Sequence, residues 1–462
     1  MAKYHLIGIG GTGLSAIARV LFERGESVSG SDTEISPLAQ ELIDLGIPIS
    51  IGHDVQNIRD AEWIIRSSAI TDINPEVKAA RERGIPVLKR MDFLQQLTEN
   101  QKVVAIAGTH GKTTTTGMIA FCLEQIGLDP SYVVGSPIIN LNKNAHAGSG
   151  EYFVIEADEY DHMFLGLRPE ILVITNIEHD HPDCYPTIEE YFKAFENLVK
   201  KTSQAGYLIM CGDHPGNQKL LQRIDFEGHI IPYGENSDNL AHIKNIVFYP
   251  NGDSGFRIAF DQAFRFGNDA LDIRLPIPGN HNILNATAAA CVLNILGIPG
   301  NTIEETISSF EGTSRRFDIQ GEIGDITVID DYAHHPTEIQ ATLSAARKKY
   351  PSREIWAVWQ PHTYSRTEQL FEFFIQSFHN CDHLIVTDIY ASREKKQNFH
   401  TKSIIDQIRH KDATYIGALE DATEFLLTHV QRNAVIIVLS AGDANQISQQ
   451  FLKSYHPLEG HK

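Results

Sequence analysis

Residues 105–121 read AIAGTHGKTTTTGMIAF, an apolar run that enters a glycine turn and continues as a helix-like stretch. The common phosphate loop, G-x-x-x-x-G-K-[ST], has four residues between its glycines, whereas Gly108 and Gly111 have two between them. The context nevertheless fits, because backbone N–H groups from Gly108 to Lys112 can form an anion nest and Lys112 brings a positive charge to phosphate. Thr113, or the threonine after it, would bring a hydroxyl to Mg²⁺. The stretch therefore predicts a nucleotide phosphate loop rather than a turn with a solvent-exposed lysine.

The rest of the chain repeats this order of elements, with short apolar runs followed by longer amphipathic ones. Such alternation is typical of βαβ units around parallel sheets, so the predicted fold class is α/β. A chain of 462 residues has room for about two to four domains. We predict three α/β blocks, with boundaries at 1–100, 101–313 and 314–462, and a β-rich patch at about 229–275.

The composition is that of a globular enzyme. The chain is 42% hydrophobic and 21% charged, and its net charge of −20 argues against non-specific binding to nucleic acid or to an anionic membrane. Its five cysteines form no C-x-x-C pair, so we expect buried free thiols in a reducing compartment. The first residues lack a signal-peptide layout, and no apolar run approaches about 18 residues. We therefore expect a cytoplasmic enzyme.

A second glycine motif, GIGGTG, lies near the start of the chain. Gly8, Gly10 and Gly13 fit the dinucleotide pattern G-x-G-x-x-G, and Asp32 ends the next predicted strand 19 residues after Gly13. The motif alone favours NAD(P), with another diphosphate ligand such as a UDP-sugar as the second choice and a tight turn without ligand as the third. It therefore indicates the diphosphate group, and not the molecule that carries it.

Two predicted strands of the second block end in polar clusters, EADEYD and TNIEHDHPD. Because sites in open parallel sheets lie beyond the carboxyl ends of strands, these clusters are expected near the phosphate loop. For a single acid, a solvated loop is the better interpretation, but the cluster as a whole favours Mg²⁺ over chance acidity and over zinc. The polar residues are Glu156, Asp158, Glu159, Asp161, Asn176, Glu178, His179, Asp180, His181 and Asp183.

The third block also places polar loops after strands. DDYAHHPTE spans Asp330 to Glu338, and QPHTYSRT spans Gln360 to Thr367. Arg366 and His362 could fix a carboxylate there, although loop capping by Asp and His would leave the same pattern. The asparagines of PGNHNILN fit an ordinary helix cap, so a contact with a base does not follow from them.

Together with SRRFD and GNHNILNA, these motifs resemble the bacterial Mur ligase family in order and spacing, over essentially the whole chain. The resemblance implies a three-domain α/β architecture. Residues 1–100 would form a Rossmann-like domain for a UDP-sugar, and 101–313 a P-loop-type central ATPase domain. Residues 314–462 would form a Rossmann-like domain for the amino acid.

The activity implied by the resemblance is ATP-dependent ligation of L-alanine to the carboxylate of UDP-N-acetylmuramate, in the synthesis of peptidoglycan precursors. ATP would convert the carboxylate to an acyl phosphate that the amine attacks, so the protein mainly positions and neutralises the transferring phosphoryl group. We expect ATP and Mg²⁺ as cofactors, and a monomer or weak dimer.

The resemblance also assigns site residues. Catalysis is expected from Lys112, His334, His362 and Arg366. ATP is expected to contact Gly108, Thr109, His110, Gly111, Lys112, Thr113, Thr114, Asn176, His281, Asn282, Arg316 and Asp331. Metal ligands are expected to be Thr113, Glu156 and His181. The UDP-sugar and alanine are expected to contact Gly10, Gly11, Thr12, His53, Ser68, Tyr332, His334, His362 and Arg366.

Two details differ from the simplest family pattern. Some family members carry a carbamoylated lysine near the position of Phe195, so no modified lysine is assigned from the resemblance. EADEYD is similar to a recycling ligase that attaches a tripeptide to the same UDP-sugar, whereas QPHTYSRT matches the alanine-adding form. Alanine addition is our first hypothesis and tripeptide addition the second. An NAD(P)-dependent dehydrogenase and a non-catalytic nucleotide-binding regulator are the remaining alternatives.

Overall fold

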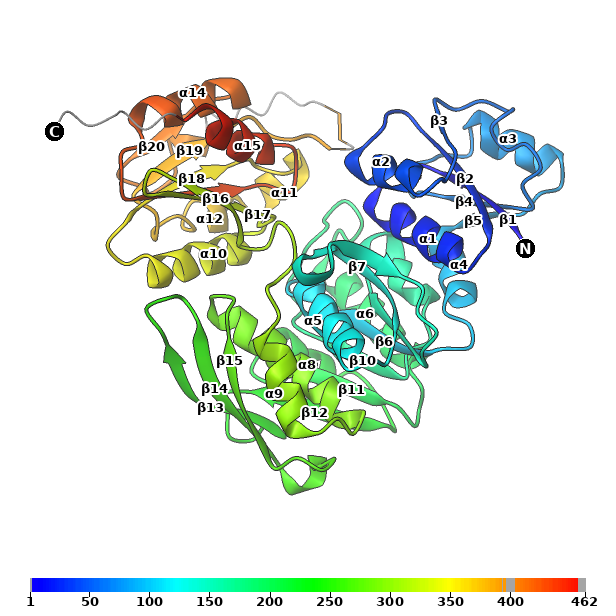
Figure 1. The fold of residues 1–462 in the computed structure, drawn as a ribbon, viewed down its shortest axis with the longest axis horizontal. Helices are drawn as coiled ribbons and strands as arrows, with labels where there is room; N and C mark the ends of the chain where they lie inside the picture. Colours follow the sequence, from blue (N-terminus) through cyan, green and yellow to red (C-terminus); the bar gives the residue numbers. More distant parts are fainter. Residues whose placement is uncertain (1, 393, 396–403, 456–462) are drawn as a thin grey trace.

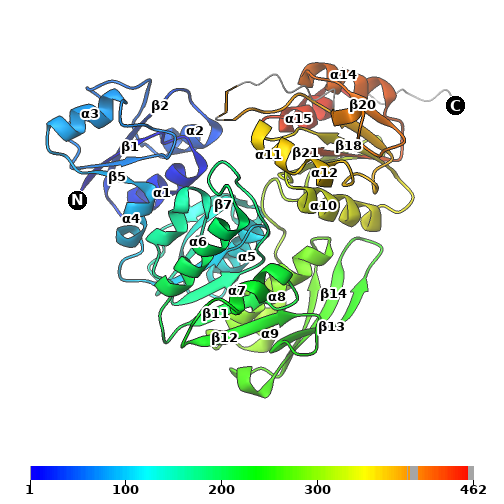
Figure 2. The ribbon, with the colours of Figure 1, turned by 180° about the vertical axis from the view of Figure 1, so that it is seen from behind.

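The computed structural model describes residues 2–392, 394–395 and 404–455, which form three α/β bodies around three separate sheets (Figure 1). The body with the amino terminus and the body with the carboxyl terminus lie side by side, and the central body lies below both (Figures 1 and 2). The predicted α/β class is confirmed.

The N-terminal sheet is parallel throughout its described strands, in the order β3-β2-β1-β4-β5. Its glycine motif follows the first strand, at the point where neighbouring connections diverge to either side. Its strands are β1 (Lys3–Ile7), β2 (Ser27–Asp32), β3 (Ile49–Ile51), β4 (Trp63–Arg66) and β5 (Val87–Lys89). Its helices are α1 (Thr12–Glu23), α2 (Pro37–Asp44), α3 (Pro75–Glu82) and α4 (Arg90–Leu97).

The central sheet is mixed. The phosphate loop follows its first strand in the chain, and the predicted β-rich patch supplies an antiparallel edge. The parallel strands are β6 (Lys102–Ala107), β7 (Ser131–Ile138), β9 (Tyr152–Glu156), β10 (Ile171–Ile174), β11 (Tyr207–Cys211) and β12 (His229–Gly234). The edges add β8 (Lys143–His146), β13 (Ala241–Phe248), β14 (Ser254–Phe260) and β15 (Ala270–Leu275). The helices are α5 (Lys112–Gln125), α6 (Ile188–Lys201), α7 (Pro215–Leu221), α8 (Asn280–Ile295) and α9 (Gly300–Ser308), with 3₁₀ turns η1 (Ile139–Leu141), η2 (Tyr160–Gly166) and η3 (Gln262–Phe264).

The C-terminal sheet has the order β16-β17-β21-β18-β19-β20 among the described residues, with only the first of these antiparallel to its neighbour. Its strands are β16 (Asp318–Ile323), β17 (Ile326–Asp331), β18 (Glu354–Trp359), β19 (His383–Val386), β20 (Ala413–Tyr415) and β21 (Ala434–Leu439). Its helices include α10 (Pro336–Lys349), α11 (Tyr364–Gln369), α12 (Phe371–Phe374), α14 (Leu419–His429) and α15 (Asn445–Ser454).

Strand β6 separates two apolar cores. Val103 and Ala105 face one side of the sheet, and Val104 and Ile106 face the other, as the two-residue period of a strand requires. The first core contains residues of α6 and continues into α1 and α4, so the N-terminal and central domains share it. The second core holds α5, α8 and α9. Phe195 of α6 is fully buried in the first core, against Phe164.

Two expectations concern the chain as a whole. Four of the cysteines are free and buried as predicted, whereas Cys184 is only half-buried. In the described part of the chain, no helix has both the length and the apolar character to cross a bilayer.

The phosphate loop tolerates no side chain at its first glycine. Gly108 has φ +126°, and a Cβ there would lie 2.1 Å from Thr175 Oγ1 and 3.0 Å from Asn176 N. Gly127 also has a positive φ, +77°, but nothing lies within 4 Å of its Cβ position. Alanine at Gly127 would therefore meet backbone strain without crowding, whereas alanine at Gly108 would meet both.

We expect Gly108→Ala to destabilise the protein more than Gly127→Ala. Backbone strain costs alanine about 1–3 kcal/mol at either position, and the overlap with Thr175 adds about 1–3 kcal/mol at Gly108 alone. The midpoint of urea unfolding, followed by far-ultraviolet circular dichroism, measures the difference. Equal shifts for the two variants would contradict the packing described for the loop.

Candidate active site

Residues outside the phosphate loop hold its short glycine turn in place by hydrogen bonds. Thr109 N donates to Asn176 O at 2.9 Å, and His110 N donates to Asn176 Oδ1 at 2.9 Å. Thr175 Oγ1 donates to His110 O at 2.6 Å. Both clamping residues follow β10, so the neighbouring strand holds the loop open toward the start of α5, with Gly111 in the left-handed region as its N-cap.

Lys112 is held at this loop by oxygen atoms. Its Nζ donates to Gly108 O at 2.6 Å and to Thr109 O at 3.0 Å, and lies 2.9 Å from a carboxylate oxygen of Glu159. Burial lowers the pKa of Lys112, but the charges of Glu159, Asp158 and Glu156 outweigh burial and raise it. The ammonium is therefore charged and positioned where a phosphate would enter.

The predicted metal ligands Thr113 and Glu156 are brought together. Thr113 Oγ1 donates to Glu156 Oε1 at 3.0 Å, and Gly135 N donates to Glu156 Oε2 at 2.6 Å. Burial raises the pKa of Glu156 even though Lys112 lowers it, so a further cation would stabilise the carboxylate. A hydroxyl and a buried carboxylate are hard oxygen donors, and this donor set fits Mg²⁺.

His181, the third predicted ligand, lies on the wall of the same cavity as Glu156. Its Nε2 is 3.8 Å from Glu159 Oε1 and 3.7 Å from Asp180 Oδ2. The acids that contact His181 are therefore Glu159 and Asp180, which the sequence analysis named only as members of the polar clusters.

A cavity of about 230 Å³ lies beside the phosphate loop, between the central and C-terminal domains. Within it Asp331 accepts hydrogen bonds from Phe317 N at 2.9 Å and Ala333 N at 2.7 Å, so its carboxylate also shapes the loop around it. Asn282 Nδ2 donates to Pro278 O at 2.7 Å. The cavity brings together the predicted ATP contacts His110, Gly111, Thr113, Thr114, Asn176, His281, Asn282, Arg316 and Asp331.

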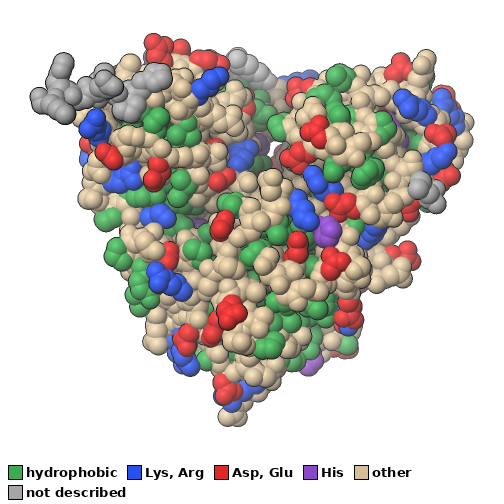
Figure 3. All heavy atoms as spheres, viewed as in Figure 1, with side chains coloured by type: hydrophobic (Ala, Val, Ile, Leu, Met, Phe, Trp, Pro, Cys, Tyr) green, Lys and Arg blue, Asp and Glu red, His purple; other side chains and the backbone are tan. Residues whose placement is uncertain are grey.

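A larger cavity of about 680 Å³ lies where the three domains meet, and the surface is hollowed there (Figure 3). It adjoins the first cavity at the phosphate loop, since Gly111, Thr113 and Arg316 line both. Its walls hold predicted residues from all three domains: Gly10, Thr12, Thr109, Lys112, Glu156, His181, Tyr332, His334, His362 and Arg366.

Arg366 is already paired in this cavity. Its guanidinium lies 2.8 Å from Asp180 Oδ1, and the two side chains are 3% and 4% exposed. A second contact joins Arg366 Nη1 to His362 Nδ1 at 3.0 Å. Burial raises the pKa of Asp180, but the charge of Arg366 holds it well below its usual range. Arg366 was predicted to hold a substrate carboxylate, and in the structure it neutralises the buried carboxylate of Asp180 in the central domain.

His334 lies beside this pair with a defined orientation. Its Nδ1–H donates to Tyr332 O at 2.9 Å, and its ring is 5.7 Å from that of His362, centre to centre. Burial, with the charge of Arg366, lowers the pKa of His334 to about 3. The neutral ring therefore keeps Nε2 as a hydrogen-bond acceptor.

The remaining predicted substrate contacts lie in the N-terminal domain, and some are outside the cavity. Gly10 N donates to Asp32 Oδ2 at 2.8 Å, so Asp32 supports the glycine turn. His53 Nδ1 lies 3.4 Å from the buried carboxylate of Glu76. The described lining of the large cavity does not include Gly11, His53 or Ser68.

Sequence reasoning missed Arg90 and Glu338. Arg90 Nη2 lies 3.0 Å from Asp158 Oδ2, and its Nη1 lies 1.5 Å from where a Cβ of Gly13 would be, so the cation covers the start of α1. Glu338 lies 3.2 Å from His110 Nδ1 and 3.5 Å from Arg316 Nη1. Glu338 is the last residue of DDYAHHPTE, and that position was the available signal, whereas Arg90 follows β5 in no motif that could have marked it.

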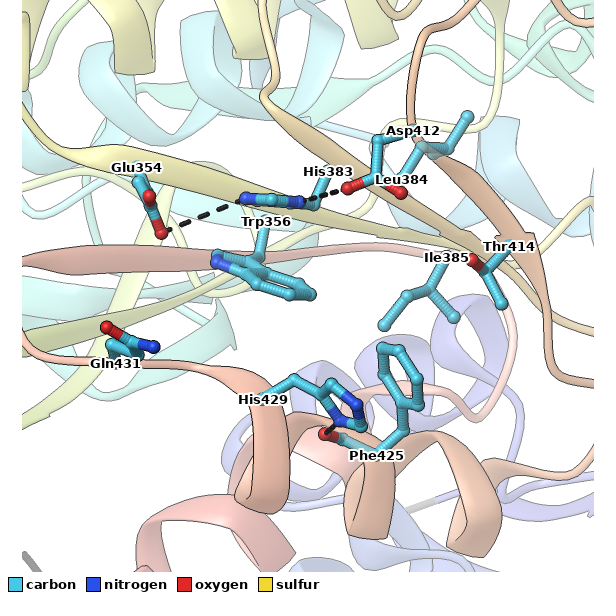
Figure 4. Close-up of a pocket in the computed structure, with 10 residues that line it drawn as sticks. All are labelled: Glu354, Trp356, His383, Leu384, Ile385, Asp412, Thr414, Phe425, His429 and Gln431. Carbon is cyan, nitrogen blue, oxygen red and sulfur yellow. Dashed lines mark hydrogen bonds and ion pairs between the residues drawn. The ribbon is translucent and has the colours of Figure 1, made fainter.

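A third cavity, of about 390 Å³, lies in the C-terminal domain (Figure 4). The ring of His383 stacks on Trp356 at 3.9 Å, with Glu354 and Asp412 on either side of His383. Glu354 and His383 are the first residues of their strands, so this cavity is at the amino ends of β18 and β19. Active sites of parallel sheets lie at the opposite ends, so we do not include this cavity in the candidate site.

The chain matches known families along most of its length. Residues 106–293 match the Mur ligase middle domain, 3–102 the Mur ligase family catalytic domain, and 315–442 the Mur ligase glutamate ligase domain.

Individual relatives match it from end to end. UDP-N-acetylmuramate–L-alanine ligase of Clostridium tetani is 40% identical over 455 residues, covering 98% of both chains. The enzyme of that name from Pelobacter propionicus is 41% identical over 448 residues, covering 95% of both. A crystal structure of UDP-N-acetylmuramate-alanine ligase from Thermotoga maritima has a TM-score of 0.83 at 29% identity, covering 98% of this chain and 99% of that one. A murein peptide ligase from Psychrobacter arcticus has a TM-score of 0.74 at 25% identity, covering 98% of both chains. The chain belongs to the Mur ligase family, with its three-domain α/β architecture.

Proposed function

We propose that the chain is an ATP-dependent ligase that joins L-alanine to the carboxylate of UDP-N-acetylmuramate, in the synthesis of peptidoglycan precursors. The observation that carries the proposal is the adjoining pair of cavities at the phosphate loop, one beside the predicted ATP contacts and one reached by all three domains. The full-length relatives named for this reaction support the choice of substrates. We further propose a cytoplasmic monomer or weak dimer.

The domain limits remain our proposal as well. Residues 1–100 would bind the UDP-sugar, 101–313 would bind ATP, and 314–462 would bind alanine. The three sheets support these limits, because no described strand pairs across them.

The proposed reaction has two steps. A carboxylate oxygen of the muramoyl group attacks the γ-phosphorus, and ADP leaves, which gives an acyl phosphate. The alanine nitrogen then attacks the acyl carbon, inorganic phosphate leaves, and the nitrogen loses a proton. Neither step needs a covalent enzyme intermediate, so the protein acts by positioning and by electrostatic stabilisation.

The described side chains fit these tasks. On nucleotide binding, Lys112 would leave Gly108 O and Glu159 and contact the β- and γ-phosphates instead. Mg²⁺ held by Thr113 and Glu156, with His181 near a second ion, would neutralise charge on the transferring group. His334 Nε2 would accept a hydrogen bond from the alanine nitrogen. The other residues assigned to ATP and to the UDP-sugar by resemblance keep those roles as part of the proposal.

The alternatives are less favoured. The tripeptide-adding ligase shares the fold, but the murein peptide ligase structure is less similar than the alanine ligase structure, with TM-scores of 0.74 and 0.83. A dehydrogenase would need Asp32 for the ribose of NAD, whereas Asp32 accepts from Gly10 N and from Thr33 N at 2.8 Å each.

The deciding experiment offers two acceptors to the purified protein. UDP-N-acetylmuramate, ATP and Mg²⁺ are incubated with L-alanine or with the tripeptide, and phosphate release is followed. We expect release with alanine. Phosphate release with the tripeptide but not with alanine would show that the protein is a recycling ligase that attaches a tripeptide. No release with either acceptor would refute the ligase proposal.

We expect Lys112→Ala to lower kcat by about 10²–10³-fold or more, because it removes a positive charge from the transferring phosphoryl group. Lys219→Ala is the matched control, since Lys219 Nζ pairs with Glu189 on the exposed surface. Circular dichroism checks that both variants are folded. Undiminished turnover of folded Lys112→Ala would place the nucleotide elsewhere.

We expect Glu156→Gln to raise the Mg²⁺ concentration needed for half-maximal activity by about tenfold or more, because a charged oxygen ligand is lost. Exposed Glu227→Gln serves as the control. The measurement is phosphate release across a Mg²⁺ titration at saturating ATP. An unchanged Mg²⁺ requirement would remove Glu156 from the metal site.

A further inference from the structure

Three imidazole rings face one carboxylate beside the phosphate loop. Glu178 Oε2 lies 3.2 Å from His110 Nε2 and 3.8 Å from His335 Nδ1, and Glu178 Oε1 lies 3.3 Å from His214 Nε2. His110 belongs to the phosphate loop, His214 precedes α7 and His335 precedes α10. Histidine and carboxylate from two domains thus meet at a single point, outside the Thr113–Glu156 pair.

We propose that His110, Glu178 and His335 form a binding site for a transition-metal dication of the zinc class. One ligand atom from each of the three lies within 4.8 Å of the other two. Zinc bonds of about 2.0–2.1 Å in a tetrahedron put neighbouring ligand atoms roughly 3.3 Å apart. Two of the distances here, 3.2 and 3.8 Å, are already close to that spacing. Imidazole nitrogen suits zinc, whereas Mg²⁺ prefers oxygen.

The groups around these ligands include outer partners of a metal site and one competitor, because His335 Nδ1 accepts from Thr337 N at 3.3 Å and a metal on that atom would replace this bond. Glu338 Oε1 lies 3.2 Å from His110 Nδ1, which is the carboxylate–histidine–metal arrangement. Thr337 Oγ1 donates to Glu178 Oε2 at 2.7 Å and orients that carboxylate. His214 Nε2 contacts the other oxygen of Glu178, and a water molecule would supply the fourth ligand.

His335 and His110 differ in whether the imidazole ring is protonated at neutral pH. Burial lowers the pKa of His335 to about 4, so this ring is neutral at physiological pH. Burial also lowers the pKa of His110, but hydrogen bonds to Glu178 and Glu338 outweigh it and raise the pKa to about 9. A metal at this point would therefore compete with the proton of His110.

The ion would join two domains. His110 and Glu178 lie in the central domain, whereas His335 caps the first helix after β17 of the C-terminal domain. His110 and Glu178 also line the cavity with the predicted ATP contacts. A bound ion would therefore brace the domain contact next to the nucleotide. The inference goes beyond the proposed reaction, because the binding requires neither ATP nor UDP-sugar.

Equilibrium dialysis of the full chain against Zn²⁺, with Mg²⁺ in large excess and no nucleotide, tests the site. We expect one tightly bound Zn²⁺ per chain, and a loss of affinity of about tenfold or more in Glu178→Gln and in His335→Asn. Asparagine is a favoured helix cap, so His335→Asn keeps the start of α10. The control His383→Asn alters a histidine between two carboxylates elsewhere and should leave the tight site intact.

The outcomes separate clearly. Unchanged zinc affinity in both variants, or loss of zinc in Glu156→Gln instead, would overturn the proposal. If the two variants fail to fold, the unmodified chain still decides, because dialysis counts the Zn²⁺ that it binds. One Zn²⁺ retained per chain against excess Mg²⁺ supports the site, and none retained would overturn it.

Discussion

The ion pair between Asp180 and Arg366 constrains the rest of the site. Asp180 follows β10 of the central domain and Arg366 lies in α11 of the C-terminal domain, and both side chains are at most 4% exposed. A buried charge that loses its partner costs about 3–5 kcal/mol, so the two domains cannot part here without a penalty unless water reaches both groups. His181 and His362 contact the same guanidinium, and the pair thereby fixes two candidate site histidines.

Much of the architecture follows from patterns that are local in sequence. Lys112 and Thr113 are recognisable because a strand, a glycine turn and a helix occur in that order within one short stretch. The rule that parallel strands present their carboxyl ends at one edge correctly brought Asn176 to the phosphate loop, where it clamps His110. By contrast, the nearness of His281, Arg316 and Asp331 came only from the family resemblance, because they lie in separate segments whose spacing carries no information about contact.

The cations that pair with acids of the two polar clusters could not be predicted either, because they lie far away in the sequence. Asp180 and Arg366 are 186 residues apart, and Arg90 meets Asp158 across a domain boundary. The clusters contain several acids with the same local pattern, so the sequence cannot tell which one pairs with a cation and which one stays available for metal.

The motif GIGGTG led to a different kind of error, because its local pattern is clear but favours the wrong ligand. Its spacing favours a dinucleotide, yet the carboxylate needed for ribose already supports the turn through Gly10 N.

The short glycine spacing has a consequence for how the loop works. Its two intervening residues are held by Thr175 and Asn176, and its lysine is held by two loop carbonyls and by Glu159. In the proposed reaction, incoming phosphates would compete with Glu159 for Lys112, and success would release a carboxylate that lies 3.8 Å from His181. Glu159 would keep the Tyr191 hydroxyl at 3.2 Å but lose its charged partner, which would favour a cation between Glu159 and His181. Phosphate entry and cation binding would thus be coupled through one lysine.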